Sequence, residues 1–382
     1  MTSISDEEFI DIRPYNDDEV AGVLARLKSD RALADNLAKL RLPRLKVAAP
    51  WVARWLITQW VRWKLRGVET VAKFQQLVEP QLQRQIAATA DFSSSGLENL
   101  SANESYLFIS NHRDIAMDPA FTNYALFSSG HRTCSVAIGD NLLRESWIAD
   151  LMRINKSFIV KRNIKAPKEL FAASRQLAKF IRYTISENQG PVWIAQREGR
   201  AKNGCDATEP AVIKMLSLSQ DRKLESIEDA LASLNIVPLA ISYELDPCDG
   251  AKAAELAGGA DYTKADDEDV QSIGLGIAGQ KGRVHLEFGA PLMGEQLDVA
   301  RVVAAIDKHV ARGYRLFETN LWAWQRLEDT ASQPPVAVYP GTVSRSAFDA
   351  RIDALPETHR MLALEMYANP LRVALKSACG SQ

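Results

Sequence analysis

The sequence predicts an α/β protein, in which a largely parallel β-sheet flanked by helices follows a helical N-terminal region. The 382 residues are 46% apolar and 25% charged, which is enough to bury a sizeable core. Residues 1 to about 92 carry apolar side chains at helical spacing, and short β-rich runs then alternate with longer helical ones. This alternation is typical of parallel sheets with helices on their faces.

The N-terminal region contains an amphipathic segment, residues 51–68, with four tryptophans. Wound as a helix, it gathers Arg54, Thr58, Gln59, Arg62 and Arg66 on one side. The opposite, apolar face holds Val52, Ala53, Leu56, Ile57, Trp60, Val61 and Trp63.

Two interpretations of this segment remain open, and both can hold at once. A surface helix that packs on the rest of the protein has such a face. Tryptophan also favours the headgroup level of a bilayer, and each Lys or Arg near an anionic leaflet contributes about 1 kcal/mol. Because residues 39–73 carry nine Lys or Arg and one acid, Glu69, we expect peripheral docking on a membrane.

Six strands are expected after this region, at residues 106–110, 133–139, 157–161, 191–195, 236–242 and 284–289. Residues 141–153 and 168–188 are expected to be helices between them, and residues 297–327 a single long helix. The run SSSG at 93–96 is predicted to be a linker, and the acidic, Gly- and Ala-rich residues 246–270 a solvated loop. The predicted domains are therefore a helical region at 1–95, an α/β domain at 96–328 and a C-terminal tail at 329–382.

Composition excludes several classes of protein. The net charge of −2 gives no sign of a nucleic-acid partner, and four scattered cysteines without a CxxC pair argue against a zinc site and a disulfide framework. We expect a reducing compartment. The acidic N-terminus does not resemble a secretory signal, and no stretch approaches the roughly 18 apolar residues of a spanning helix.

The candidate site begins in ISNHRDIAMDPAF, residues 109–121, where His112 follows a predicted strand by two residues. Active sites of parallel sheets lie beyond the carboxyl ends of the strands. The HRD triplet is also found in protein kinases, but Pro119 stands where a kinase has its asparagine. No glycine-rich loop with a lysine strand precedes the triplet and no DFG follows at a sensible distance, so a kinase is excluded.

Further motifs follow His112 in a fixed order. Asp114 and Asp118 come first, then Arg162 at the end of a strand, then the block QREGRAK at 196–202, then VPLAIS from residue 237. This series, over residues 105–242, resembles the glycerolipid acyltransferase family, which includes lysophosphatidic acid and glycerol-3-phosphate acyltransferases. Three departures mark a divergent branch: a His-x5-Asp spacing where the family has His-x4-Asp, NKS at 155–157 in place of the leading glycine, and QREGRAK for FPEGTR.

The resemblance implies a role for each of these residues. His112 would act as general base on an acceptor hydroxyl, which contributes about 10²- to 10⁴-fold in rate. Asp118 matches the family aspartate and is favoured as the partner of His112, whereas Asp114 is the alternative or caps a helix that begins near Ile115. The residues expected to bind an acceptor phosphate, or to shape the turn that presents it, are Arg162, Arg200, Lys202, Glu198 and Gly199.

The predicted activity is O-acyl transfer from acyl-CoA or acyl carrier protein to a glycerol-3-phosphate or lysophosphatidate-type acceptor in phospholipid synthesis. Neither a metal nor an organic redox cofactor is implied. The expected location is peripheral, on the cytoplasmic face of a membrane. Two alternatives remain. One is a serine hydrolase or lipase-like esterase using Ser110 or another serine with His112, although no G-x-S-x-G elbow is present, and the other is a non-catalytic lipid-binding protein.

Overall fold

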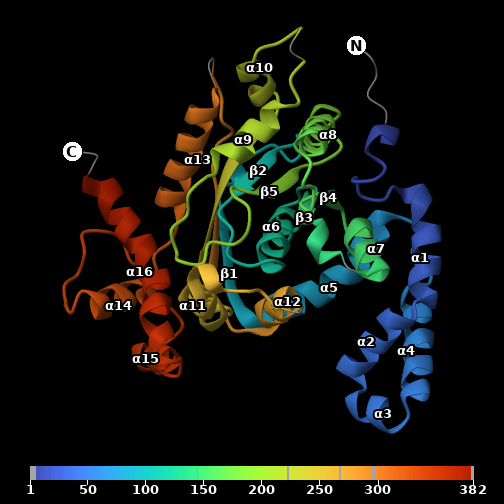
Figure 1. Cartoon of the computed structure of the whole chain (residues 1–382), viewed down its shortest axis with the longest axis horizontal. Coiled ribbons are helices and arrows are strands. Elements are labelled where there is room, and N and C mark those ends of the chain that lie inside the picture. Colours follow the sequence, from blue (N-terminus) through green and yellow to red (C-terminus); the bar gives the residue numbers. More distant parts are fainter. Residues whose placement is uncertain (1–5, 144, 222, 266–267, 295–296, 380–382) are drawn as a thin grey trace. The chain divides into compact units, whose positions relative to one another are not determined.

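The structure is a computed structural model that describes residues 6–143, 145–221, 223–265, 268–294 and 297–379 (Figure 1). It divides into two compact units that interleave along the chain. The smaller unit comprises residues 1–81 and 135–173, and the larger one residues 82–134 and 174–382. The domain boundaries inferred from the sequence stay predictions.

The larger unit contains a sheet with the strand order β1-β7-β6-β2-β5. Every pairing in it is parallel except that of β6 with β7, and β3 pairs in parallel with β4 in the smaller unit. The predicted fold class, a largely parallel sheet with helices, is therefore confirmed. The strands are β1 (Ala90–Ser95), β2 (Leu107–Ser110), β3 (Ser135–Gly139), β4 (Ser157–Val160), β5 (Val192–Ala195), β6 (Ile236–Tyr243) and β7 (Gly282–Phe288).

The six predicted strands are present because their apolar runs are buried. All residues of β2 and β6 are buried, as expected for central strands of a parallel sheet. The prediction of a linker at 93–96 is wrong for residues 93–95, because these three serines belong to β1. The register places Ser93 opposite His285 and Ser95 opposite Glu287, and the hydroxyl groups of both serines lie 2.9 Å from nitrogens of the His285 ring. Bonds to a distant strand thus override the low β-propensity of serine.

Two other predictions about the larger unit are wrong. Residues 246–270 do not form a solvated loop: α11 and the start of α12 lie here, and Lys252 of α11 is buried. The single helix expected at 297–327 is divided into α13 and α14 by an extended segment around Tyr314. The helices of this unit are α6 (Met117–Ser128), α9 (Pro210–Ser217), α10 (Ile227–Ala232), α11 (Asp249–Gly258), α12 (Glu268–Ala278), α13 (Val299–Gly313), α14 (Glu318–Leu327), α15 (Arg345–Asp353) and α16 (Glu357–Cys379).

The smaller unit is mostly helical, which confirms the predicted helical N-terminal region. Its helices pack around their own apolar core, to which α4 contributes Ala53, Ile57 and Val61. They are α1 (Val20–Ser29), α2 (Arg31–Arg41), α3 (Pro43–Ala48), α4 (Pro50–Lys64) and α7 (Ser146–Ile154), whereas α5 (Val71–Thr89) and α8 (Pro167–Ser186) each run through both units.

The predicted apolar face of α4 is only partly buried. Leu56 and Trp63, both assigned to that face, are exposed, as are Trp51 and Trp55. The reason is geometric: Ala53, Ile57 and Val61 form a narrow stripe that fills the contact with the bundle, and the bulkier side chains on either side remain outside it. In the described part of the chain, no helix has the length and apolar character needed to cross a membrane.

Candidate active site

His112 lies in the segment that follows β2, held between two other parts of the larger unit. Its carbonyl oxygen accepts a hydrogen bond of 2.9 Å from the backbone N–H of Ala201. Its ring packs edge-on against Trp193 of β5, with centroids 5.6 Å apart. The side chain is 13% exposed, so the ring is mostly enclosed yet still reaches the surface of the site.

Asp118, in the first turn of α6, is paired with this histidine. Asp118 Oδ2 lies 2.8 Å from His112 Nδ1, and the carboxylate is fully buried. The same oxygen accepts hydrogen bonds from the backbone N–H groups of Arg113 at 2.6 Å and Asp114 at 3.0 Å. An ionised carboxylate is an acceptor only, so His112 Nδ1 carries the proton of their hydrogen bond. Nε2, which bonds to none of the described residues, then presents a lone pair.

Tyr243 completes the environment of this carboxylate from the last position of β6. Its hydroxyl donates a 2.8 Å hydrogen bond to Asp118 Oδ1. Burial, with the negative charge of Asp118, raises the pKa of Tyr243 well above its usual value. The tyrosine therefore remains a donor at physiological pH. Sequence analysis missed this residue, which lies one position beyond the predicted strand.

Asp114 has a different role from that of Asp118. Its Oδ1 accepts hydrogen bonds from the backbone N–H groups of Ala116 at 2.9 Å and Met117 at 2.8 Å, at the start of α6. Burial and the neighbouring Asp118 raise its pKa. Gly276 of α12 approaches so closely that a Cβ there would lie 2.1 Å from Asp114 Oδ2. The structure thus pairs His112 with Asp118 and uses Asp114 as a helix cap.

Buried charges surround the two residues on either side of His112. Asp206 Oδ2 accepts hydrogen bonds from Arg113 Nη2 at 2.6 Å and from Asn111 Nδ2 at 3.1 Å. Lys252 Nζ donates a 2.7 Å hydrogen bond to the Arg113 carbonyl and forms an ion pair with Asp246. These long-range partners fix the His112 segment. No local pattern in the sequence predicts these contacts.

The residues predicted to bind phosphate are divided between the two units. Arg200 and Lys202 flank Ala201, the residue bonded to the His112 carbonyl. Arg200 is half-buried and makes a long, 3.4 Å hydrogen bond to Ser272 Oγ, whereas Lys202 forms an ion pair with Glu255. Arg162 belongs to the smaller unit, at the end of β4, where its backbone N–H donates to Asp140 Oδ1 at 3.2 Å.

Glu198 and Gly199 form the exposed turn before Arg200. Gly199 has φ +71°, a left-handed conformation that favours glycine. The Glu198 backbone N–H makes a long, 3.4 Å hydrogen bond to Glu209 Oε2. Among the described residues, no group of three or more His, Cys, Asp or Glu side chains is arranged to hold a metal ion.

Replacement of Tyr243 by phenylalanine tests the support of the Asp118 carboxylate. The change removes one charge-assisted hydrogen bond and keeps the ring, which packs edge-on against Phe121. We expect kcat of the reaction at this site to fall about tenfold with little change in KM, because the bond orients the base rather than the substrate. Steady-state kinetics measure the two constants. A rise in KM with kcat unchanged would contradict this role.

The structure is thus an α/β protein in which a histidine beyond the end of a parallel strand has its Nδ1 held by a buried carboxylate, an arrangement that leaves Nε2 able to accept a proton. Residues 91–241 match the model of the family described as Acyltransferase. Residues 91–241 are therefore similar to an acyltransferase domain, in agreement with the family predicted from the sequence motifs.

Comparisons of the chain with solved structures and with curated proteins give two further results. A crystal structure of the 1-acyl-sn-glycerophosphate (LPA) acyltransferase PlsC from Thermotoga maritima is similar to this chain with a TM-score of 0.38 and 11% identity. The similarity covers 80% of this chain and 100% of that one. No curated protein gives a significant match.

Proposed function

We propose that this acyltransferase moves a fatty acyl chain from a thioester, acyl-CoA or acyl carrier protein, to the hydroxyl of a glycerol-3-phosphate or lysophosphatidate-type acceptor. The observation that carries the proposal is the 2.8 Å contact of His112 Nδ1 with the buried Asp118 carboxylate, within the acyltransferase domain. This contact orients Nε2 as a base for the acceptor hydroxyl.

The proposed reaction is a direct transfer. The acceptor oxygen attacks the thioester carbonyl carbon while its proton moves to His112 Nε2, and Asp118 stabilises the imidazolium that forms. The tetrahedral intermediate then breaks its carbon–sulfur bond, and the leaving thiolate takes the proton back from Nε2. The products are an ester and a free thiol, and neither a redox step nor a metal is required by this balance.

Arg200 is the favoured candidate for the acceptor phosphate. It follows the turn at Gly199 and directly precedes Ala201, which bonds to the His112 carbonyl. Its long bond to Ser272 is weak, so exchanging it for a bidentate contact with phosphate is favourable. Lys202 would first have to leave Glu255. Arg162 belongs to the smaller unit, and its role in phosphate binding stays a prediction.

The geometry disfavours Ser110 as a hydrolytic nucleophile. Ser110 is fully buried, its hydroxyl donates to the Asn111 carbonyl at 2.7 Å, and it accepts a bond from Trp193 Nε1 at 3.1 Å. A nucleophilic serine must face the substrate and donate to its base. We expect no reaction with a fluorophosphonate probe, in contrast to a serine hydrolase.

An acceptor panel tests the proposed function. The purified protein is incubated with labelled long-chain acyl-CoA, or with labelled acyl carrier protein, against glycerol-3-phosphate, lysophosphatidate and an uncharged lysolipid. We expect acylation that requires the phosphate. Equal acylation of the uncharged lysolipid would contradict the proposal that the enzyme requires a phosphate on its acceptor. Acylation of no acceptor would contradict acyl transfer to this class of substrate.

We also propose that the smaller unit docks on the cytoplasmic face of a membrane. On α4, Trp51, Trp55 and Trp63 are 74%, 59% and 65% exposed. Arg62 of the same helix is also exposed, and tryptophan with arginine is a combination suited to an anionic lipid interface. A lysolipid acceptor resides in the same bilayer, so docking would give the protein access to this class of acceptor.

Replacement of the three exposed tryptophans tests this docking. We expect Trp51→Ala, Trp55→Ala and Trp63→Ala combined to lower the partition coefficient onto anionic vesicles by at least about tenfold, because each indole transfers apolar area to the interface. Vesicle co-sedimentation measures the partition.

A matched control replaces Leu224, Met293 and Met361, which are 72%, 83% and 57% exposed in the larger unit, by alanine. The control should bind as the unaltered protein does. If both triple variants lose binding equally, the docking surface is not α4.

A further inference from the structure

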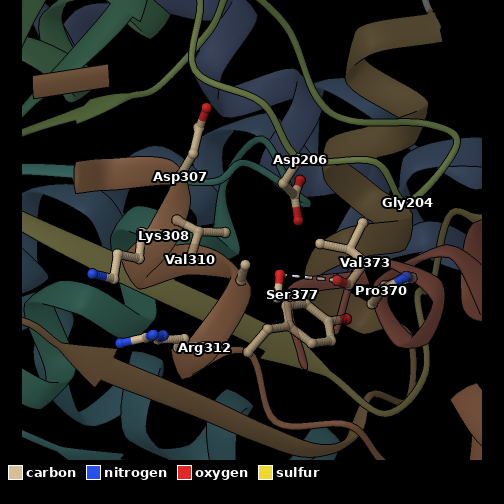
Figure 2. Close-up of a pocket in the computed structure, with 11 residues that line it drawn as sticks. Gly204, Asp206, Asp307, Lys308, Val310, Arg312, Pro370, Val373 and Ser377 are labelled. Atoms are coloured by element: carbon tan, nitrogen blue, oxygen red, sulfur yellow. Dashed lines mark hydrogen bonds between the residues drawn. The ribbon is translucent and has the colours of Figure 1, made fainter. Parts of the chain in front are cut away.

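A pocket of about 420 Å³ lies in the larger unit, on elements that the proposed reaction does not use. It is bounded by residues 204–206, the C-terminal half of α13 and the later turns of α16 (Figure 2). Val310, Ala311, Pro370 and Val373 give it apolar walls. The volume is in the range of pockets that hold small molecules.

Asp206 reaches this pocket from the His112 side. Its side chain is 8% exposed, and Figure 2 shows the carboxylate turned toward the middle of the pocket. Oδ2 is taken by Arg113 and Asn111, but the buried Oδ1 has no hydrogen-bond partner among the described residues. An unsatisfied buried acceptor costs about 1–3 kcal/mol, so this oxygen favours a ligand that supplies a donor.

The other charged side chains that line the pocket do not compete for this position. Lys308 and Arg312 point away from the middle of the pocket in Figure 2. Asp307 Oδ1 accepts a 2.8 Å hydrogen bond from the backbone N–H of Thr208. Among the labelled side chains, the charge that faces inward is therefore the negative charge of Asp206.

A positive charge on the ligand matches this environment better than a neutral donor. Burial raises the pKa of Asp206, although the neighbouring Arg113 opposes that change. A cation at Oδ1 favours the ionised carboxylate, and an ammonium N–H gives a charge-assisted hydrogen bond that is about twice as strong as a neutral one.

We propose that this pocket binds a small organic ammonium ion. The nitrogen donates to Asp206 Oδ1, and a short carbon chain lies against Val310, Ala311 and Val373. The proposal goes beyond the proposed acyl transfer and does not depend on it, because binding is measured without turnover. Asp206 also holds Asn111 and Arg113, so the bound ligand contacts the residue that fixes both neighbours of His112.

Propylammonium chloride is the probe, with potassium chloride and 1-propanol as controls for ionic strength and for the carbon chain. Isothermal titration calorimetry gives the affinity, and thermal unfolding at tenfold the Kd gives the stabilisation. We expect saturable binding of propylammonium alone and a rise in Tm of about 2 °C or more. Equal effects of 1-propanol or of potassium chloride would overturn the assignment.

Three variants place the binding in the pocket. Asp206→Asn removes the negative charge of the pocket. Val373→Phe fills the space beside the apolar wall with a larger side chain and leaves the hydrogen bonds of Asp206 in place. Each variant should weaken binding at least tenfold. Asp307→Asn is the matched control, since Asp307 lines the pocket with its carboxylate engaged elsewhere, and should bind within about twofold of the unaltered protein. If Asp206→Asn does not fold, Val373→Phe decides alone: unchanged affinity in this variant overturns the proposal.

Discussion

His112→Ala is expected to lower kcat for acyl transfer by about 10²- to 10⁴-fold, the usual contribution of a positioned general base. Nδ1 of the imidazole is fixed by Asp118, which leaves Nε2 as the nitrogen proposed to take the proton. KM should change little, because the histidine contacts the reacting hydroxyl rather than the part of the acceptor that gives binding energy. Steady-state kinetics with a saturating acyl donor measure both constants.

The control for this variant is His359→Ala, at the start of α16, which bonds locally to Pro356 through its backbone. It should keep the unaltered kcat. Thermal unfolding should show that His112→Ala remains folded, since the ring is partly exposed. If His112→Ala retains more than about a third of the activity while folded, His112 is not the base.

Asp118→Asn is expected to lower kcat by a similar factor, about 10²- to 10⁴-fold. Asp118 accepts from His112 Nδ1, from two backbone N–H groups and from Tyr243. An asparagine amide must turn its NH₂ group toward some of these donors. If the amide donates to Nδ1, the proton of the imidazole moves to Nε2, where the lone pair is needed.

Asp114→Asn is the matched comparison, because the two aspartates lie in one segment and both are buried. Its amide oxygen can still accept from Ala116 and Met117, so kcat should fall by no more than about threefold. If kcat falls further in Asp114→Asn than in Asp118→Asn, and the two variants are equally stable, the pairing of His112 with Asp118 is contradicted.

The parts of the fold that could be predicted are those encoded locally. Buried strands such as β2 and β6 are continuous apolar runs, and no competing pattern obscures them. Strand β1 was missed because Ser93 and Ser95 favour a linker on composition, and the partners of their hydroxyls, His285 and Glu287, lie about 190 positions further on. Lys252 was placed in a solvated loop because its burial depends in part on a distant partner, the Arg113 carbonyl, in addition to its ion pair with Asp246.

The site follows the same division. His112 and Asp118 are six positions apart at a strand end, so the motif predicted them and the structure pairs them. Tyr243 and Asp206 come from distant segments, and each supports the His112 segment through hydrogen bonds that depend on the folded sheet. Sequence spacing contains no information about such contacts, which explains why both residues were missed.

In the proposed reaction, the acyl chain passes directly from the thioester to an acceptor hydroxyl, with His112 as the base and without an acyl-enzyme. The most direct test is intact-protein mass spectrometry of samples quenched in acid during turnover of acyl-CoA with lysophosphatidate, with the diacyl product measured in the same samples. We expect the diacyl product to increase with time while the protein mass stays unchanged. A protein mass increased by one acyl group, formed and consumed at the rate of turnover, would contradict it.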